Sequence, residues 1–241
     1  MKTASSAEKP VLILLPGLPG SGELFEPLAT QLQHRFDIDA VSYPKDEPLG
    51  YDGLLDLVSS RIPKEKSYFL LGESFGGPLA ITAASRHPEN LVGVVLAATF
   101  VKSPMAWWIN RLKPFVNSPF LDWRPARFIN DRLIGPLGDK EMRQWIHKSM
   151  PRLNRNVLAA RIMSVLEVNV REELKSLKVP VLYLAGARDW LVDRRSLDAV
   201  WLCRPDVEIK VIDGVHMILQ TNARDSAKAI LEFISRIKGS S

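Results

Sequence analysis

A serine enclosed by glycines carries the most specific chemical signal in this chain. Residues 72–77 read GESFGG, a G-x-S-x-G pattern that follows the apolar run YFLLG and leads into the helical stretch PLAITAASRH. A serine on such a strand-to-helix turn takes a strained backbone conformation that projects its hydroxyl from the edge of a sheet, and small glycines let neighbouring backbone pass closely. We therefore predict that Ser74 is a nucleophile for attack on a carbonyl carbon.

A serine hydroxyl becomes nucleophilic only when a base removes its proton, so a histidine must approach it. His34 and His87 lie near the ends of expected helices, where histidines commonly contact terminal carbonyls, and His147 lies in a basic segment. His216 follows the last expected strand through a glycine-containing loop and precedes the last expected helix. Parallel strands would bring that loop to the same edge as Ser74, so we predict His216 as the general base.

A third group, a carboxylate, must hold the imidazole in its productive tautomer. Asp189 comes a few residues after the apolar run VPVLYLA and lies between the serine and the histidine in chain order, as expected for a nucleophile on such a turn. Asp193 is the alternative, although it also suits the N-cap of a following helix. Asp213 is too close to His216 along the chain. We predict Asp189 in this role.

Attack on a carbonyl produces an oxyanion, which needs preorganised donors. The N–H of Phe75, the residue after the nucleophile, is the first candidate. The second should come from the glycine-rich loop LLPGLPGSGELF after the first expected strand. Pro19 has no N–H, so Leu18 is the predicted second donor.

Short apolar runs rich in β-branched residues alternate with helical stretches along the chain. The expected strands are residues 11–15, 38–42, 68–72, 92–97, 181–185 and 208–212. The expected helices are residues 23–33, 54–61, 75–87, 195–202 and 221–237. Several strands are almost continuously apolar, as parallel strands covered on both faces should be. The pattern predicts an α/β protein with a mostly parallel, about six-stranded sheet and helices on both faces.

Residues 102–176 interrupt this alternation and are rich in tryptophan and proline. They are predicted to form a helical cap inserted into a core made of residues 1–101 and 177–241, because insertions at the carboxyl ends of strands lie over the ligand crevice. Most of the tryptophans should fill the cap's own interior. The residues expected to line a largely apolar acyl pocket are Pro19, Trp107, Trp108, Trp190 and Met217.

The net charge of +5 is unevenly distributed. Between Lys102 and Val170 there are twelve Lys or Arg and five Asp or Glu, a surplus of seven that leaves the rest of the chain at minus two. These basic residues are scattered among Trp and Pro with no recognisable nucleic-acid module, so we expect a solvated basic face and no nucleic-acid partner.

No apolar run approaches the roughly eighteen residues of a membrane span, and no apolar stretch follows the N-terminal lysine. A cytoplasmic protein without stable membrane insertion is expected. Cys203 is the single cysteine, so no intramolecular disulfide can form and no cysteine cluster can hold zinc or an iron–sulfur centre.

Four motifs together resemble the α/β-hydrolase fold family in its small carboxylesterase branch: the PG-x-P-G-S loop, GESFGG, G-x-x-D-x-x-V and the final Gly-x-His. The resemblance covers nearly the whole chain outside the cap. The first expected strand of this chain corresponds to the third of the eight strands in the family's sheet. It implies the same triad and oxyanion donors, an acyl-enzyme intermediate and no cofactor. Pro16 replaces a histidine that many members carry, and Val215 replaces a glycine usual before the histidine, which leaves the subfamily open.

These observations predict a carboxylesterase-type serine hydrolase that cleaves small-molecule esters of small to medium acyl chains. The same triad could instead cleave a thioester, a lactone or the carbon–carbon bond of a β-diketone. A catalytically silent ligand-binding protein on this fold is the alternative from another class. Glu73 should be partly buried, where it would either hydrogen-bond a neighbouring loop or tune the site electrostatically; the first is favoured because buried carboxylates are usually paired.

Overall fold

The computed structural model describes residues 9–104, 131–136 and 138–239, and these contain one six-stranded sheet. Its strands pair in the order β2-β1-β3-β4-β5-β6, and every pairing is parallel. The predicted α/β class with a parallel sheet is therefore confirmed. In chain order the strands are β1 (Val11–Leu15), β2 (Asp37–Ala40), β3 (Tyr68–Glu73), β4 (Leu91–Ala97), β5 (Val181–Gly186) and β6 (Glu208–Ile212).

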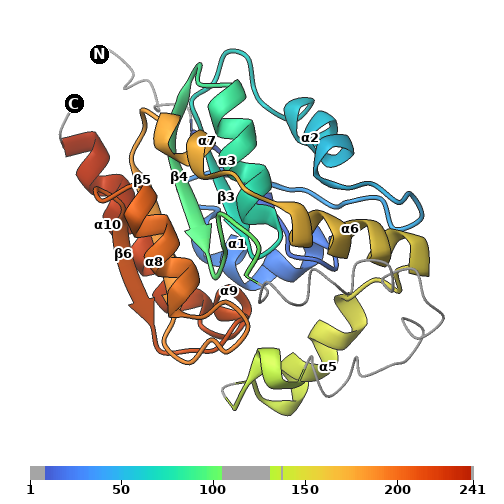
Figure 1. Ribbon diagram of the computed structural model, residues 1–241. Coiled ribbons are helices and arrows are strands. Elements are labelled where there is room, and N and C mark those ends of the chain that lie inside the picture. The colour runs from blue at the N-terminus through green and yellow to red at the C-terminus, as the bar shows by residue number, and fades with distance from the viewer. Residues whose placement is uncertain (1–8, 105–130, 137, 240–241) are drawn as a thin grey trace, which may run out of the picture.

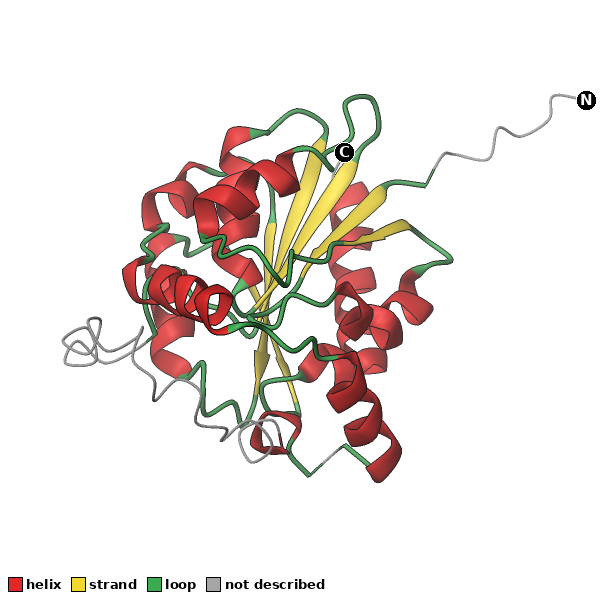
Figure 2. Cartoon of the chain, turned by 90° about the vertical axis from the view of Figure 1, so that its right-hand side faces the viewer, coloured by secondary structure: helices red, strands yellow, loops and turns green. Residues whose placement is uncertain are grey.

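Helices cover both faces of this sheet, which Figure 2 shows nearly edge-on between them. One face packs against α2 (Tyr51–Ser59), α3 (Gly76–Arg86), α7 (Arg171–Ser176) and α8 (Arg194–Cys203). The other packs against α1 (Glu26–Leu32), α9 (Ile218–Thr221) and α10 (Ala223–Gly239). Alternate residues of each strand point to opposite faces, so a strand buried on both sides is mostly apolar, as β3 is up to its last residue, Glu73.

Two expected helices have other bounds in the structure. The helix predicted over residues 23–33 is a 3₁₀ turn, η1 (Gly22–Phe25), followed by α1, whose second residue is Pro27. Because proline suits the first turn of a helix and lacks a backbone donor, it begins α1 separately. The last helix, expected from residue 221, begins at Ala223 and follows the separate short helix α9, which ends at Thr221. Periodicity alone could not show these breaks.

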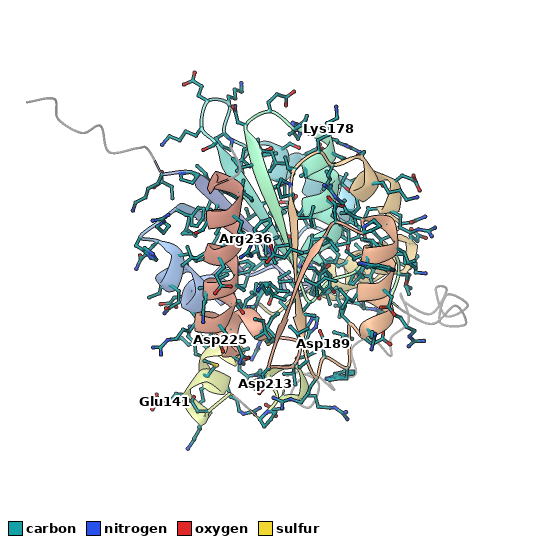
Figure 3. All side chains as sticks on the ribbon, turned by 90° about the vertical axis from the view of Figure 1, so that its left-hand side faces the viewer. Glu141, Lys178, Asp189, Asp213, Asp225 and Arg236 are labelled. Atoms are coloured by element: carbon teal, nitrogen blue, oxygen red, sulfur yellow. The ribbon has the colours of Figure 1, made fainter. Side chains whose placement is uncertain are left out.

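The carboxyl ends of the strands gather the loops that carry the predicted chemistry. In Figure 3, Lys178 just before β5 and Asp189 just after it lie at opposite ends of the sheet. Since all strands run the same way, the loops after β1, β3 and β6 open at the end where Asp189 lies. The common direction of the strands therefore collects segments that are far apart in the sequence.

The described part of the segment predicted as a cap is helical. It contains α5 (Lys140–Ser149), α6 (Arg155–Glu167) and α7, and an isolated antiparallel bridge joins Lys102 to Asn169. Figure 1 shows α5 beyond the ends of the strands, whereas α7 packs against α3 and α8. The bounds of the cap stay a prediction. None of the helices among the described residues is long and apolar enough to cross a membrane.

Candidate active site

Ser74 occupies a sharp turn between β3 and α3. Its φ angle is +51°, in the left-handed region that side chains rarely adopt, and hydrogen bonds hold it there. The Ser74 N–H donates to the Ala97 carbonyl at 2.9 Å. The Ser74 carbonyl accepts from the Thr99 hydroxyl at 2.5 Å and from the Gly77 N–H at 3.1 Å. The turn is thus fastened to the end of β4, which keeps the serine side chain at the edge of the sheet.

Two glycines of the G-x-S-x-G pattern are required by close backbone passage. A Cβ atom on Gly72 would lie 2.4 Å from the Gly76 carbonyl oxygen, and one on Gly76 would lie 2.2 Å from the Leu15 carbonyl oxygen. Both obstacles are backbone atoms, so neither contact could be relieved by a side-chain rotation. The motif seen in the sequence is therefore a packing requirement of the turn as well as a chemical signature.

The structure brings together the three side chains that the sequence predicted as a triad. His216 Nε2 lies 2.9 Å from Ser74 Oγ, and His216 Nδ1 lies 2.8 Å from Asp189 Oδ2. The His216 and Asp189 side chains are only 8% and 2% exposed. A continuous hydrogen-bonded relay from hydroxyl to imidazole to carboxylate is thus shielded from water, an arrangement that can take a proton from the serine.

Asp189 is held in place by more than the histidine. Its second oxygen, Oδ1, accepts the N–H groups of Leu191 at 2.9 Å and Val192 at 3.0 Å. Asp193, the alternative, caps α8 through the Arg195 N–H at 3.0 Å and pairs with the Arg195 side chain. The hydrogen bond and charge pairing with Arg195 lower the pKa of Asp193. Asp189 is therefore the carboxylate that lies against the candidate base.

The three other histidines lie elsewhere. His87 is the C-cap residue of α3, and its Nε2 lies 3.0 Å from the Ser59 hydroxyl. His147 on α5 faces Asp131 at 3.5 Å. His34 lines a surface groove between α1 and α10. Position along the chain had already separated His216 from them, and the geometry agrees.

The predicted oxyanion donors, Leu18 and Phe75, lie beside the serine. Both line one cavity with Ser74, and a Cβ on Gly17 would lie 3.6 Å from Ser74 Cβ, so the loop after β1 passes close to the nucleophile. The N–H groups of Leu18 and Phe75 have no acceptor among the described residues. Two unpaired donors next to a nucleophile are what a developing oxyanion requires.

Two small apolar cavities meet at Ser74. The first, of about 230 Å³, is lined by Phe75, Phe100 and residues of α6 that include Ile162 and Val165. The second, of about 220 Å³, is lined by residues that include Pro19, Leu24, Met150, His216 and Met217. Leu18, Ser74 and Leu191 line both. A ligand could thus extend from the serine in two directions.

The pocket residues predicted from the sequence divide into three groups. Pro19 and Met217 line the second cavity, as expected. Trp190 lines neither cavity: the residue is 44% exposed, with the Arg132 guanidinium carbon 5.1 Å from its ring centre, and Leu191 lines both cavities. Trp107 and Trp108 lie outside the described residues.

Glu73, just before the nucleophile, is buried and hydrogen-bonded, although its partner lies on α9. Its Oε2 accepts from the Gln220 side-chain amide at 3.2 Å. Burial raises the pKa of Glu73 to about 7, an effect that the nearby His216 and the hydrogen bond from Gln220 offset only in part. The carboxyl therefore changes its charge near neutral pH, within the wall of the second cavity.

This raised pKa predicts a pH-dependent stability that Glu73→Gln should remove. Below about pH 4.5 the carboxyl is protonated in both folded and unfolded chains; as pH rises toward 7 the unfolded chain ionises first, so the folded state loses stability. Relative to Glu73→Gln, the wild type should lose roughly 3 kcal/mol of unfolding free energy between pH 4.5 and 8. Urea unfolding at several pH values measures this free energy, and the control variant is Glu65→Gln, which changes an exposed carboxyl. An equal pH dependence of the unfolding free energy in wild type and Glu73→Gln would contradict the prediction.

One buried charge of this region was not predicted from the sequence. Arg161 on α6 is 0% exposed, and its Nη1 donates to the carbonyls of Leu18 at 2.8 Å and Pro19 at 3.0 Å. Its Nη2 donates to the Pro44 carbonyl at 2.9 Å. The sequence does show a single arginine within the apolar stretch NVLAARIMSVL, which indicates a buried charge. It does not show which groups the arginine contacts, because these lie more than a hundred residues away along the chain.

Among the described residues, no three His, Cys, Asp or Glu side chains gather as a metal ion would require.

Comparisons with known proteins show similarity to hydrolases. Residues 51–221, most of the chain, match the hydrolase family described as "Serine aminopeptidase, S33". A pimeloyl-[acyl-carrier protein] methyl ester esterase of Xylella fastidiosa is 26% identical, over 95% of this chain and 96% of its own length. One from Aliivibrio fischeri is 24% identical over 75% of this chain and 76% of its length.

Solved structures share the fold at low sequence identity. An esterase from Exiguobacterium antarcticum superposes with a TM-score of 0.83 at 14% identity, covering 95% of this chain and 92% of that one. MenH from S. aureus superposes with a TM-score of 0.77 at 20% identity, covering 98% and 97%.

Proposed function

We propose that this chain, which belongs to the serine aminopeptidase S33 family of α/β hydrolases, hydrolyses carboxylic esters through an acyl-enzyme intermediate on Ser74. The observation that carries the proposal is the relay from Ser74 Oγ through His216 to Asp189, with both contacts under 3 Å and two unpaired N–H groups beside it. A ligand-binding protein would have no need for such an arrangement.

In the proposed reaction, Ser74 Oγ attacks the ester carbonyl while His216 Nε2 accepts the hydroxyl proton. The N–H groups of Leu18 and Phe75 hold the resulting oxyanion. The tetrahedral intermediate expels the alcohol, which takes the proton from His216, and leaves an acyl group on the serine. Water then attacks the acyl carbon while His216 takes one of its protons. The bond between the acyl carbon and Ser74 Oγ breaks to release the acid, and His216 returns the proton to Ser74 Oγ, so the enzyme regains its starting state. The reaction needs no cofactor.

The curated relatives support the bond that is cleaved. Several relatives that align with three quarters or more of this chain are named as methyl ester esterases, which favours an ester over the thioester, lactone and carbon–carbon alternatives. The enzyme class expected from the sequence, an ester-hydrolysing serine hydrolase, rests on these relatives together with the family match. A small-molecule ester is the proposed partner, and a cytoplasmic location stays a prediction.

The two cavities support a substrate of small to medium size. Each is smaller than the roughly 300–1,000 Å³ typical of sites for drug-sized ligands. Because His216 must protonate the departing alcohol, we assign the cavity that it lines to the alcohol and the cavity against α6 to the acyl chain. Residues 102–176 are proposed as the cap, and residues of this segment line both cavities.

A series of p-nitrophenyl esters from acetyl to palmitoyl tests the proposal. We expect kcat/KM to peak among the short and medium chains and to fall toward palmitoyl, because the acyl cavity of about 230 Å³ excludes long chains. Thioesters and lactones of matching size belong in the same series, and faster turnover of either would change the assigned bond. A folded protein that cleaves none of them and does not react with a fluorophosphonate probe would overturn the hydrolase assignment.

A further inference from the structure

The loop that carries the Leu18 N–H is held by its carbonyl groups. Each carbonyl from Pro16 to Gly20 accepts a hydrogen bond. Pro16 receives one from the Tyr43 hydroxyl at 3.1 Å, and Gly17 receives one from the Gly20 N–H at 2.9 Å. The carbonyls of Leu18 and Pro19 share Arg161 Nη1, and Gly20 receives one from the Tyr43 N–H at 2.8 Å.

This pattern determines where the Leu18 N–H points. In a trans peptide the C=O and the N–H of one plane point in opposite directions. The Gly17 carbonyl turns toward Gly20, so the N–H of Leu18 in the same plane turns the other way. The next plane, with the Leu18 carbonyl, is held by Arg161. Both planes that flank Leu18 are thereby fixed, and its N–H is left unpaired among the described residues.

The contact between Arg161 and the loop is closely packed. A Cβ on Gly20 would lie 2.7 Å from Arg161 Nη1 and 3.0 Å from Tyr43 Cβ, and the Gly20 φ angle of +79° already favours glycine. The guanidinium carbon lies 5.5 Å from the centre of the Tyr43 ring, at cation–π distance. Arg161 forms no ion pair with a carboxylate among the described residues. Loop carbonyls and an aromatic ring therefore compensate its burial in part, in contrast to the usual paired buried charge, and Arg161 Nε is left without a hydrogen-bond partner among the described residues.

Resting on the proposed ester hydrolysis, we infer that Arg161 is a positioning residue that orients the oxyanion donor Leu18 from α6. The same helix contributes Ile162, Val165 and Leu166 to the proposed acyl cavity. A single element thus shapes the acyl site and aligns the oxyanion site. Packing of α6 against the core therefore forms the acyl cavity and positions the Leu18 N–H at the same time. Substitution of Arg161 should consequently weaken binding of the transition state even when the acyl group is too short to contact α6.

Arg161→Met tests this inference in the full-length chain with p-nitrophenyl acetate as substrate. Since removal of one oxyanion donor typically costs about 10²–10³ in kcat, misorientation of Leu18 should lower kcat by about 100-fold. KM should change by less than threefold, because the acetyl group makes few contacts with α6. A small alkyl trifluoromethyl ketone, which forms an oxyanion adduct on serine, should lose affinity in proportion to kcat/KM.

The matched control is Ser164→Ala, one turn further along α6. The Ser164 hydroxyl accepts from the Tyr51 N–H at 3.3 Å, so its loss also weakens the docking of α6 to the core but leaves residues 16–20 untouched. We expect a kcat within twofold of the wild type. A purely structural role of Arg161 would make the two variants alike, with lowered Tm and raised KM and no selective loss of kcat.

Arg161→Lys keeps the proposal testable where the methionine variant does not fold. A single ammonium cannot reach the Leu18 and Pro44 carbonyls as the two guanidinium nitrogens do, so kcat should fall about tenfold. A folded Met or Lys variant with the wild-type kcat and ketone affinity would overturn the inference. Absence of turnover in the wild type would instead count against ester hydrolysis itself. Failure of the Arg161 inference and failure of the proposed function can therefore be told apart.

Discussion

Ser74→Ala should abolish turnover while leaving the fold intact. Loss of the nucleophile in a triad that works as a unit typically costs about 10⁶ in kcat, and only binding and the oxyanion donors remain to assist water. The change removes one oxygen, and the Ala97 and Thr99 hydrogen bonds to the backbone at position 74 do not involve it. Burst and steady-state kinetics with the best p-nitrophenyl ester measure the effect, and circular dichroism reports the fold.

The control for this variant is Ser85→Ala, at the far end of α3. The Ser85 hydroxyl donates to the Thr82 carbonyl within the helix and lines neither cavity at Ser74. Its kcat/KM should stay within twofold of the wild type. Residual turnover of Ser74→Ala above a few parts in a thousand, or its labelling by a fluorophosphonate, would assign the nucleophile to another residue.

Asp189→Asn should lower kcat by about 10⁴-fold with little change in KM. The amide would either face the His216 Nδ1–H with its NH₂ group or drive the imidazole into the wrong tautomer, in which Nε2 carries the proton and cannot accept one from Ser74. The amide oxygen can still accept the N–H groups of Leu191 and Val192, so the loop should keep its shape. Kinetics with the same ester and a matched unfolding curve separate the chemical loss from a loss of stability.

Asp193→Asn is the matched control because it makes the same change four residues along the same loop. Asparagine caps helices as well as aspartate does, so α8 should be retained, and only an exposed pair with Arg195 is lost. Turnover should stay within twofold of the wild type. If instead Asp193→Asn loses activity and Asp189→Asn keeps it, the carboxylate role passes to Asp193 and the loop must rearrange during turnover.

Most of what the sequence predicted depends on short-range geometry. Apolar runs become buried strands because a parallel strand covered on both faces tolerates few polar residues, and GESFGG becomes a tight turn because its glycines are the residues that fit against backbone. The parallel order of the strands then required Ser74, Asp189 and His216 to open at one edge. The sequence by itself therefore determined the fold class and the residues of the candidate triad.

The tertiary structure alone decided what depends on packing between distant segments. Arg161 lies against Leu18 and Pro44, Trp190 lies at the surface while Leu191 lines the site, and the space at Ser74 divides into two cavities. Each of these results depends on how helices of the inserted segment and the loops dock against the sheet. Local periodicity carries no information about such docking, because it depends on the volumes and hydrogen-bonding groups of residues far apart in the chain.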